Sequence, residues 1–198
     1  MAMRRSEQLE QTRTAILTTA RKLFLKNGYQ NTSTRDIAGE IGITQPALYH
    51  HFNDKEVIFL EVISEIGKEV RNNVNKTLRK QNLDPEERLF EITKVLTKIH
   101  HNSITTLIYE SYKELSSSGK RKLEMLFKMN YLAPIAEYFK LPEVPLRAEI
   151  LPDEAAEFFL ADINTLFGTF NKLGGHQLSN DDRVKLTLQF FLYGIATK

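Results

Sequence analysis

The sequence contains no cysteine, and this absence excludes disulfide bonds, thiolate metal ligands and cysteine nucleophiles. It also contains no run of about 18 or more apolar residues, so it offers no candidate for a membrane-spanning helix. Residues 1–13 are largely polar and lack the apolar core of a secretory signal peptide. These absences lead us to expect a cytoplasmic protein without a membrane partner.

The residue patterns of the common catalytic and metal sites are also missing. There is no phosphate-binding glycine loop, no set of nucleophile, base and orienting residue, and no spacing of metal ligands. Two pairs of adjacent histidines occur, at 50–51 and 100–101, but neighbours in a helix do not face each other and chelate poorly. We therefore expect no enzyme activity, no catalytic residues, no metal and no cofactor.

What the sequence does contain is typical of a globular protein. Its 198 residues are 41% hydrophobic and 26% charged, which allows a sizeable core. The net charge of +2 is small, but residues 1–55 hold eight Lys or Arg against five Asp or Glu. A positive N-terminal part is expected if that part meets nucleic-acid phosphates, although an asymmetry of this size also arises by chance.

Apolar residues recur with helical spacing along the whole chain, and no stretch shows the alternation of a strand. The pattern predicts an all-α fold. Pro134 should kink or divide one of the helices. We expect about nine helices, at residues 7–27, a short stretch between 33 and 42, 44–52, 53–80, 84–102, 104–115, 119–140, 153–173 and 181–196.

Residues 32–55 contain the most specific pattern, two short helices joined by a tight turn and followed by the start of a long helix. Ser33, with Asp36 three residues later, has the spacing of a capping box, and Thr44 caps the next helix. Gly42 permits the tight turn, and the small Ala38 permits two helices to cross closely. The spacing predicts a helix-turn-helix with a small apolar core formed by Ile37, Ile43, Leu48 and Phe52.

This segment resembles the signature of TetR (tetracycline-repressor) family regulators at residues 34–38 (TRDIA), 42–44 (GIT), 48–52 (LYHHF) and 55–56 (KE). Upstream, Ala20, Phe24 and the pair Gly28-Tyr29 resemble it as well. The resemblance implies a three-helix DNA-binding domain over residues 1–55 and a larger helical domain for ligand binding and dimerisation over residues 56–198. Gln45-Pro46 departs from many members of the family, so a base preference cannot be carried over.

The second helix of a helix-turn-helix lies in the major groove, so its exposed residues are candidates for reading bases. Gln45 can pair with adenine through two hydrogen bonds, and Ala47 can pack on a thymine methyl group. Tyr49, His50 and Lys55 are expected to contact phosphates, Lys55 at a helix start where backbone amides also favour anions. Contact with a base edge is the alternative for His50. The predicted DNA-binding residues are Thr34, Arg35, Thr44, Gln45, Pro46, Ala47, Tyr49, His50 and Lys55.

The last two predicted helices are apolar on more than one face, which requires either a large core or a partner chain. The resemblance implies the second option, a four-helix interface between two copies of the chain. Burial within one chain is the alternative. The predicted interface residues are Phe159, Ile163, Phe167, Phe170, Leu188, Phe191, Leu192 and Ile195.

The resemblance also implies a ligand pocket among the helices that follow the DNA-binding domain. Aromatic and apolar residues with a few polar tips suit a mid-sized, mostly apolar ligand, although core packing is the more frequent role of each residue taken singly. Gly67, inside the long helix, is a candidate flexible point. The candidate lining residues are His100, Tyr109, Tyr112, Met125, Phe127, Met129, Tyr131 and Phe158.

From the residues and the resemblance together, we expect a homodimeric transcriptional repressor that binds a palindromic operator on double-stranded DNA. A small, mostly apolar inducer would release it by binding better to the state that does not fit DNA. One alternative is an activator, or a nucleoid-associated or division-linked DNA-binding factor, on the same fold. Another is a small-molecule carrier whose N-terminal domain binds DNA without sequence preference.

Overall fold

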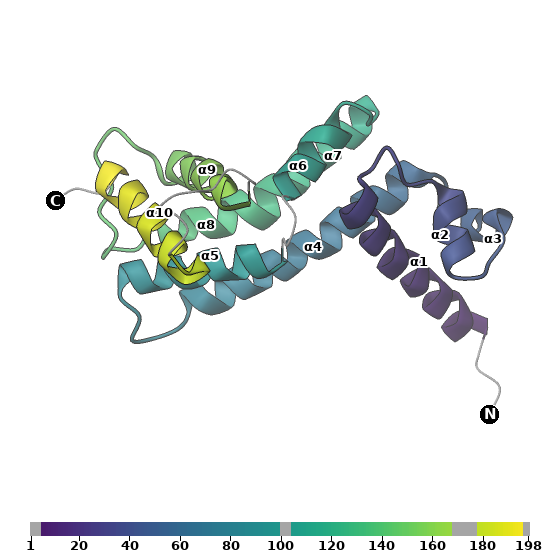
Figure 1. Cartoon of the computed structure of the whole chain (residues 1–198), viewed down its shortest axis with the longest axis horizontal. Helices are drawn as coiled ribbons and strands as arrows, with labels where there is room; N and C mark the ends of the chain where they lie inside the picture. The colour runs from purple at the N-terminus through teal and green to yellow at the C-terminus, as the bar shows by residue number, and fades with distance from the viewer. Residues whose placement is uncertain (1–4, 100–103, 168–177, 196–198) are drawn as a thin grey trace. The chain divides into compact units, whose positions relative to one another are not determined.

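The computed structural model describes residues 5–99, 104–167 and 178–195, and every element assigned in them is helical (Figure 1). The prediction of an all-α fold is confirmed. The elements are α1 (Arg5–Asn27), α2 (Thr34–Glu40), α3 (Gln45–Tyr49), α4 (Lys55–Leu78), α5 (Pro85–Ile99), α6 (Ile104–Tyr112), α7 (Ser117–Phe127), a π-helix (Lys128–Leu132), α8 (Ala133–Tyr138), α9 (Pro152–Ile163), a 3-10 helix (Asn164–Phe167) and α10 (Asn180–Ile195).

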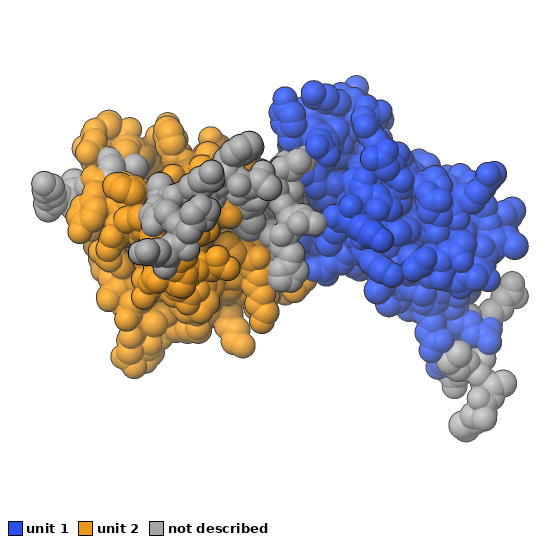
Figure 2. All heavy atoms as spheres, in the orientation of Figure 1, with its two compact units in different colours: residues 1–66, 104–125 blue, residues 67–103, 126–198 orange. Residues whose placement is uncertain are grey.

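Contacts among the helices divide the chain into two units, which Figure 2 colours separately. Unit 1 comprises residues 1–66 and 104–125, and unit 2 comprises residues 67–103 and 126–198. The division predicted from the sequence lies at residue 55 instead. The units place the first half of α4, together with α6 and most of α7, with the helix-turn-helix segment.

The core of unit 1 is built around α1 and the first half of α4. Ile16 and Phe24 of α1 are fully buried, at the spacing that predicted the inner stripe of this helix. The rings of Phe24, Tyr29 and Phe59 lie with their centroids 4.7–5.9 Å apart. Gly28 has a φ of 81° and ends α1, as its predicted position after the helix requires. This aromatic cluster joins α1 to α4.

The core of unit 2 contains a second aromatic cluster, contributed by α9, α10 and the residue that follows α8. The rings of Phe139, Phe159 and Phe191 lie with their centroids 5.6–6.3 Å apart. Phe159 is fully buried, and the other two rings are almost so. Large apolar side chains buried in this way are the main stabilising contribution to a helical domain.

Arg88 of α5 closes the C-terminal end of α4. Its side chain is buried, and its guanidinium donates hydrogen bonds to the carbonyl oxygens of Leu78 and Lys80 at 2.8 Å and of Leu83 at 3.2 Å. The last carbonyls of a helix have no partner within it and carry partial negative charge, so a buried cation is stabilised there. The sequence pattern had not indicated this role.

The helix predicted over residues 119–140 is divided, but by a π-turn rather than by a break. The backbone N–H of Ala133 donates to the carbonyl of Lys128, five residues earlier, just before Pro134. A proline ring collides with the preceding helical turn and lacks an N–H, and the wider π-turn accommodates it. The π-turn also places Asn130 in the interior, where its side chain is buried.

Gly67 owes its place in α4 to packing. It is buried, and a Cβ added to it would lie 2.9 Å from Cβ of Asn130 and 3.1 Å from its Cγ. The helix continues through this position from Lys55 to Leu78. A glycine here lets the π-turn pack against α4. The sequence had instead suggested Gly67 as a candidate flexible point.

Replacing Gly67 by Ala is expected to lower the melting temperature, because overpacking a buried site costs about 1–3 kcal/mol. The gain in helix propensity, roughly 1 kcal/mol, does not offset this cost. Gly39 of α2 is the matched control, since a Cβ there meets nothing within 4 Å, and Gly39→Ala should leave or raise the melting temperature. Circular dichroism of both variants measures the difference. A Gly67→Ala variant as stable as Gly39→Ala would contradict the packing role.

Candidate nucleic-acid interface

The first helix of the helix-turn-helix begins with the predicted capping box. The Asp36 N–H donates to Oγ of Ser33 at 3.2 Å, and the Ser33 N–H donates to the Asp36 carboxylate at 2.8 Å. The Ser33 hydroxyl also donates to the Asp36 carboxylate at 2.7 Å, and this bond, with the one from the Ser33 N–H, holds the pKa of Asp36 below its ordinary value. Two otherwise unpaired N–H groups are thereby satisfied, which fixes the start of α2.

The turn and the second helix also follow from local chemistry. Gly42 has a φ of 71°, a conformation that other residues rarely adopt. Thr44 caps α3 by accepting from the Ala47 N–H at 3.3 Å, and Pro46 occupies the first turn, where its missing N–H costs nothing. Helix α3 ends at Tyr49, three residues earlier than predicted, but Leu48 and Phe52 are buried as expected.

Charged side chains fasten these helices to one another within unit 1. Arg13 of α1 pairs with the carboxylate of Glu61 at 2.6 Å, and its guanidinium lies 4.8 Å from the ring centroid of Phe52. Lys22 pairs with Glu40 at the end of α2 at 3.0 Å, but both side chains are exposed and stabilise the contact little. The Arg13 contact therefore joins α1, α4 and the end of the helix-turn-helix.

The predicted DNA-binding residues differ in how much of their surface is exposed to solvent. Tyr49 has 44% of its surface exposed, whereas Thr34 has only 8%. Thr34 is therefore mostly buried, and it can position other side chains of the set as well as contact DNA. The exposed members of the set are Arg35, Thr44, Pro46, Tyr49 and His50, and the half-buried members are Gln45, Ala47 and Lys55.

Three members of the set meet in a cluster of polar groups, here called the Gln45 cluster. Nε2 of Gln45 donates to Oγ1 of Thr34 at 3.0 Å and to the hydroxyl oxygen of Tyr49 at 3.3 Å. The two hydroxyl groups are hydrogen-bonded to each other at 3.2 Å. Gln45 and Tyr49 are four residues apart on α3, a spacing that predicts proximity. The part of Thr34, from the start of α2, had no sequence signal.

Lys55, expected on a phosphate, has its ammonium against Tyr29 in the free protein. Nζ donates to the carbonyl oxygen of Tyr29 at 2.9 Å and lies 4.1 Å from the centroid of its ring. Burial of the Lys55 ammonium lowers its pKa. Burial of the Tyr29 hydroxyl, together with the nearby carboxylates of Glu56, Asp54 and Glu114, raises the pKa of Tyr29 to about 12. One of the three N–H groups of Lys55 is thus engaged, and a phosphate contact would use the others.

The first turn of α4 also holds the start of α7. The carboxylate of Glu56 accepts from the Ser116 N–H at 2.8 Å and from its hydroxyl at 2.5 Å. Ser116 in turn caps α7 by accepting from the Gly119 N–H at 3.1 Å. A side chain at Gly119 would collide with Glu56. Gln30 and Glu114 add a further hydrogen bond of 2.8 Å between the same parts of unit 1.

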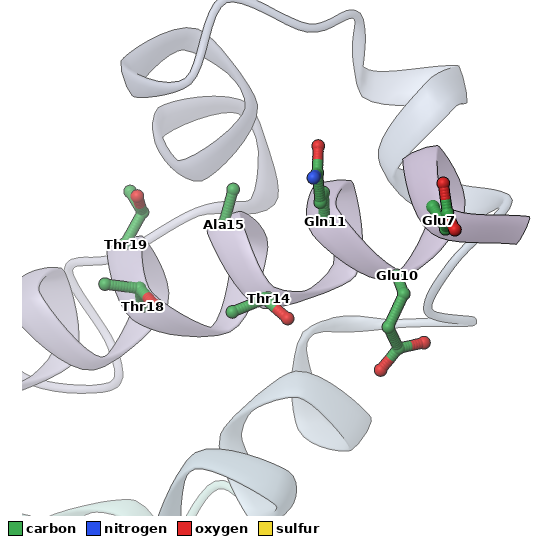
Figure 3. Close-up of a pocket in the computed structure, with 7 residues that line it drawn as sticks. All are labelled: Glu7, Glu10, Gln11, Thr14, Ala15, Thr18 and Thr19. Atoms are coloured by element: carbon green, nitrogen blue, oxygen red, sulfur yellow. The ribbon is translucent and has the colours of Figure 1, made fainter. Parts of the chain in front are cut away.

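A shallow concavity on α1 carries no comparable chemistry. Figure 3 shows that all the residues lining it project from this one helix. The carboxylates of Glu7 and Glu10 lie at it and would repel a phosphate. The described residues also contain no group of three or more His, Asp or Glu that could hold a metal ion, and no helix among them could span a membrane. The residues that line the concavity on α1 are Glu7, Glu10, Gln11, Thr14, Ala15, Thr18 and Thr19.

The candidate ligand-lining residues are not gathered in one interior. Tyr131 is buried, and its ring stacks on that of half-buried Phe127 at 5.3 Å. His100 lies outside the described residues. Helical spacing identified apolar stripes but not which stripe turns inward. Five of the eight candidates lie on the surface instead, namely Tyr109, Tyr112, Met125, Met129 and Phe158.

Four of the eight predicted dimer residues are buried within the subunit. Four of them fill the core of unit 2, because the inner stripes of α9 and α10 face each other and α8. Leu192 is half-buried, while Phe170 and the side chains of Phe167 and Ile195 lie outside the described residues. The neighbouring stripe is the exposed one, with Phe158, Phe190 and Tyr193 at least 65% exposed. The four core residues are Phe159, Ile163, Leu188 and Phe191.

Comparison with known proteins gives a family match that lies within unit 1. Residues 16–62 match the family model described as bacterial regulatory proteins, tetR family. The chain is 31% identical over 106 residues to the HTH-type transcriptional regulator AcrR of Shigella flexneri, a match covering 53% of this chain and 47% of AcrR. The chain thus spans about half the length of this relative. It is 25% identical over 205 residues to UidR of Escherichia coli (strain K12), covering 96% and 95% of the two chains.

A solved structure has the same fold over nearly its full length. It is a putative transcriptional regulator from Saccharomonospora viridis in complex with choline, with a TM-score of 0.72 at 23% identity, covering 96% of this chain and 100% of that chain. The family match falls on the segment whose caps, tight turn and exposed α3 form a helix-turn-helix. On this evidence, residues 16–62 are a segment of the type found in the TetR family of bacterial regulatory proteins.

Proposed function

We propose that this protein is a homodimeric transcriptional repressor that binds a palindromic operator through α3 and is released by a small, mostly apolar ligand. The observation that carries the proposal is the short helix α3, whose Leu48 is buried while Tyr49, and His50 just after the helix, are exposed. Helices of this kind enter the major groove and read base edges from their N-terminal residues. Gln45 stands at that end of α3.

Dimerisation is proposed through the exposed stripe of α9 and α10. Phe158, Phe190 and Tyr193 are 65–70% exposed, although large aromatic side chains stabilise a protein most when buried. Exposed aromatic groups on neighbouring helices are typical of surfaces that bind a protein partner. A second copy is the partner that DNA recognition requires, because two recognition helices spaced by about 34 Å, or a multiple of it, read a palindrome.

Ligand binding is proposed within unit 2, near the π-turn. Asn130 is only 3% exposed, and its carbonyl oxygen Oδ1 is buried without a hydrogen-bond partner. A buried polar atom of this kind calls for a partner, and the described residues supply none. The relative from Saccharomonospora viridis was solved with choline, which supports the view that the fold can hold a small molecule. A ligand with one donor group on an apolar body would suit Asn130.

Selection of bound sequences from random double-stranded DNA tests the proposed function. We expect a motif of two inverted half-sites whose centres are one helical turn, or a multiple of it, apart. Affinity for this motif should fall steeply with salt, because binding releases counterions from phosphates. A shuffled sequence of the same length and composition is the control. Equal binding to both sequences would contradict the repressor and favour a carrier with a non-specific DNA-binding domain.

The double variant Phe190→Asp with Tyr193→Asp is expected to dissociate the dimer, because paired apolar surfaces cannot bury unpaired carboxylates. Sedimentation should change from twice the chain mass of 22.9 kDa to that mass, and affinity for the selected operator should fall at least about tenfold. Tyr109→Asp is the matched control, since Tyr109 is 68% exposed but lies in unit 1. A double variant that sediments as the wild type does would place the interface elsewhere.

A further inference from the structure

The amide of Gln45 is already engaged before any DNA is bound. Its nitrogen contacts the hydroxyl groups of Thr34 and Tyr49, and these two hydroxyl groups contact each other. The three heavy atoms form a closed triangle with sides of 3.0, 3.3 and 3.2 Å. No hydrogen bond to the carbonyl oxygen Oε1 of Gln45 is present among the described residues. The two ends of the amide therefore differ in what they have left to offer.

Counting hydrogens decides which end of the amide faces the hydroxyl groups. Three contacts need three hydrogens placed between the atoms. With the nitrogen inward, the amide supplies two hydrogens and the hydroxyl groups supply one each, which is enough. With the oxygen inward, only the two hydroxyl hydrogens remain for three contacts. The orientation with Nε2 inward is thus the one that satisfies the whole Gln45 cluster, and it leaves Oε1 for another partner.

The free end of the amide determines which bases it can recognise. Pairing with adenine through two hydrogen bonds requires Nε2 to donate to N7 while Oε1 accepts from the N6 amino group. Turning Nε2 toward N7 would weaken its bonds to Thr34 and Tyr49. Oε1 alone can accept from the N6 amino group of adenine or from the N4 amino group of cytosine. Guanine and thymine present only acceptors at the corresponding major-groove positions, and these repel a carbonyl oxygen.

We propose that Thr34 and Tyr49 hold Gln45 as a hydrogen-bond acceptor, so that the base it meets is selected for an exocyclic amino group, adenine or cytosine, against guanine and thymine. The inference rests on the proposed binding of DNA through α3. Thr34 and Tyr49 are positioning residues in this account. Four hydrogens serve three contacts in the Gln45 cluster, so one hydroxyl hydrogen is left over and can still go to a phosphate.

The test compares sequences selected by full-length wild type with those selected by Tyr49→Phe, Thr34→Val and the double variant. Each change removes a hydroxyl group and keeps most of the side-chain volume. For the wild type, one position of each half-site should accept adenine and cytosine and exclude guanine and thymine. In the double variant, Nε2 is free to donate to N7, and the preference for adenine over cytosine should rise about fivefold at that position.

Two control variants separate this effect from a general disturbance. Thr34→Ser keeps a hydroxyl group and should keep the wild-type preference. Thr97→Val removes a hydroxyl group that donates to the carbonyl oxygen of Lys94, outside the cluster, and should keep it as well. The inference would be overturned if no position of the wild-type half-site accepts both adenine and cytosine, so that each selective position prefers adenine alone, guanine or thymine. An adenine-to-cytosine ratio that stays the same in the double variant would overturn it as well. Failure of the wild type to select any motif would instead contradict the proposed function.

Discussion

A helix of five residues cannot be stable by itself, and the position of α3 therefore depends on the side chains that it buries. Leu48 is fully buried and Phe52, just beyond the helix, nearly so. Their burial, at about 1.5–3 kcal/mol for each side chain, holds α3 against the rest of unit 1. Because only one side of so short a helix can be buried, its remaining residues stay available at the surface. The packing of α3 and its proposed contact with DNA are thus two consequences of one constraint.

The helix-turn-helix segment packs in unit 1 with residues beyond the first three helices. Glu56 accepts two hydrogen bonds from Ser116, and Lys55 next to it is held by Tyr29. Helix α4 shares its first half with unit 1 and its second half with unit 2.

Local patterns were sufficient to predict the caps of the helix-turn-helix and part of its exposed face, since Thr44, Tyr49 and His50 are exposed while Gln45 and Ala47 are half-buried. The capping box at Ser33 and the turn at Gly42 depend on neighbouring residues alone, so the sequence contains the whole of their cause. The tertiary contacts were not predictable in this way. Phe190 and Phe191 are adjacent and equally apolar, yet one is exposed and the other buried, because the packing of α10 on α9 decides between them. The Gln45 cluster likewise needs Thr34 from another helix.

In the proposed complex with DNA, α3 presents Gln45 to the bases. Selection of DNA sequences by the Gln45→Ala variant, beside the wild type, measures this contact. Base preference should disappear at one position in each half-site, while the remaining positions and the salt dependence of binding are kept. If the variant selects the same motif as the wild type at every position, Gln45 does not read a base.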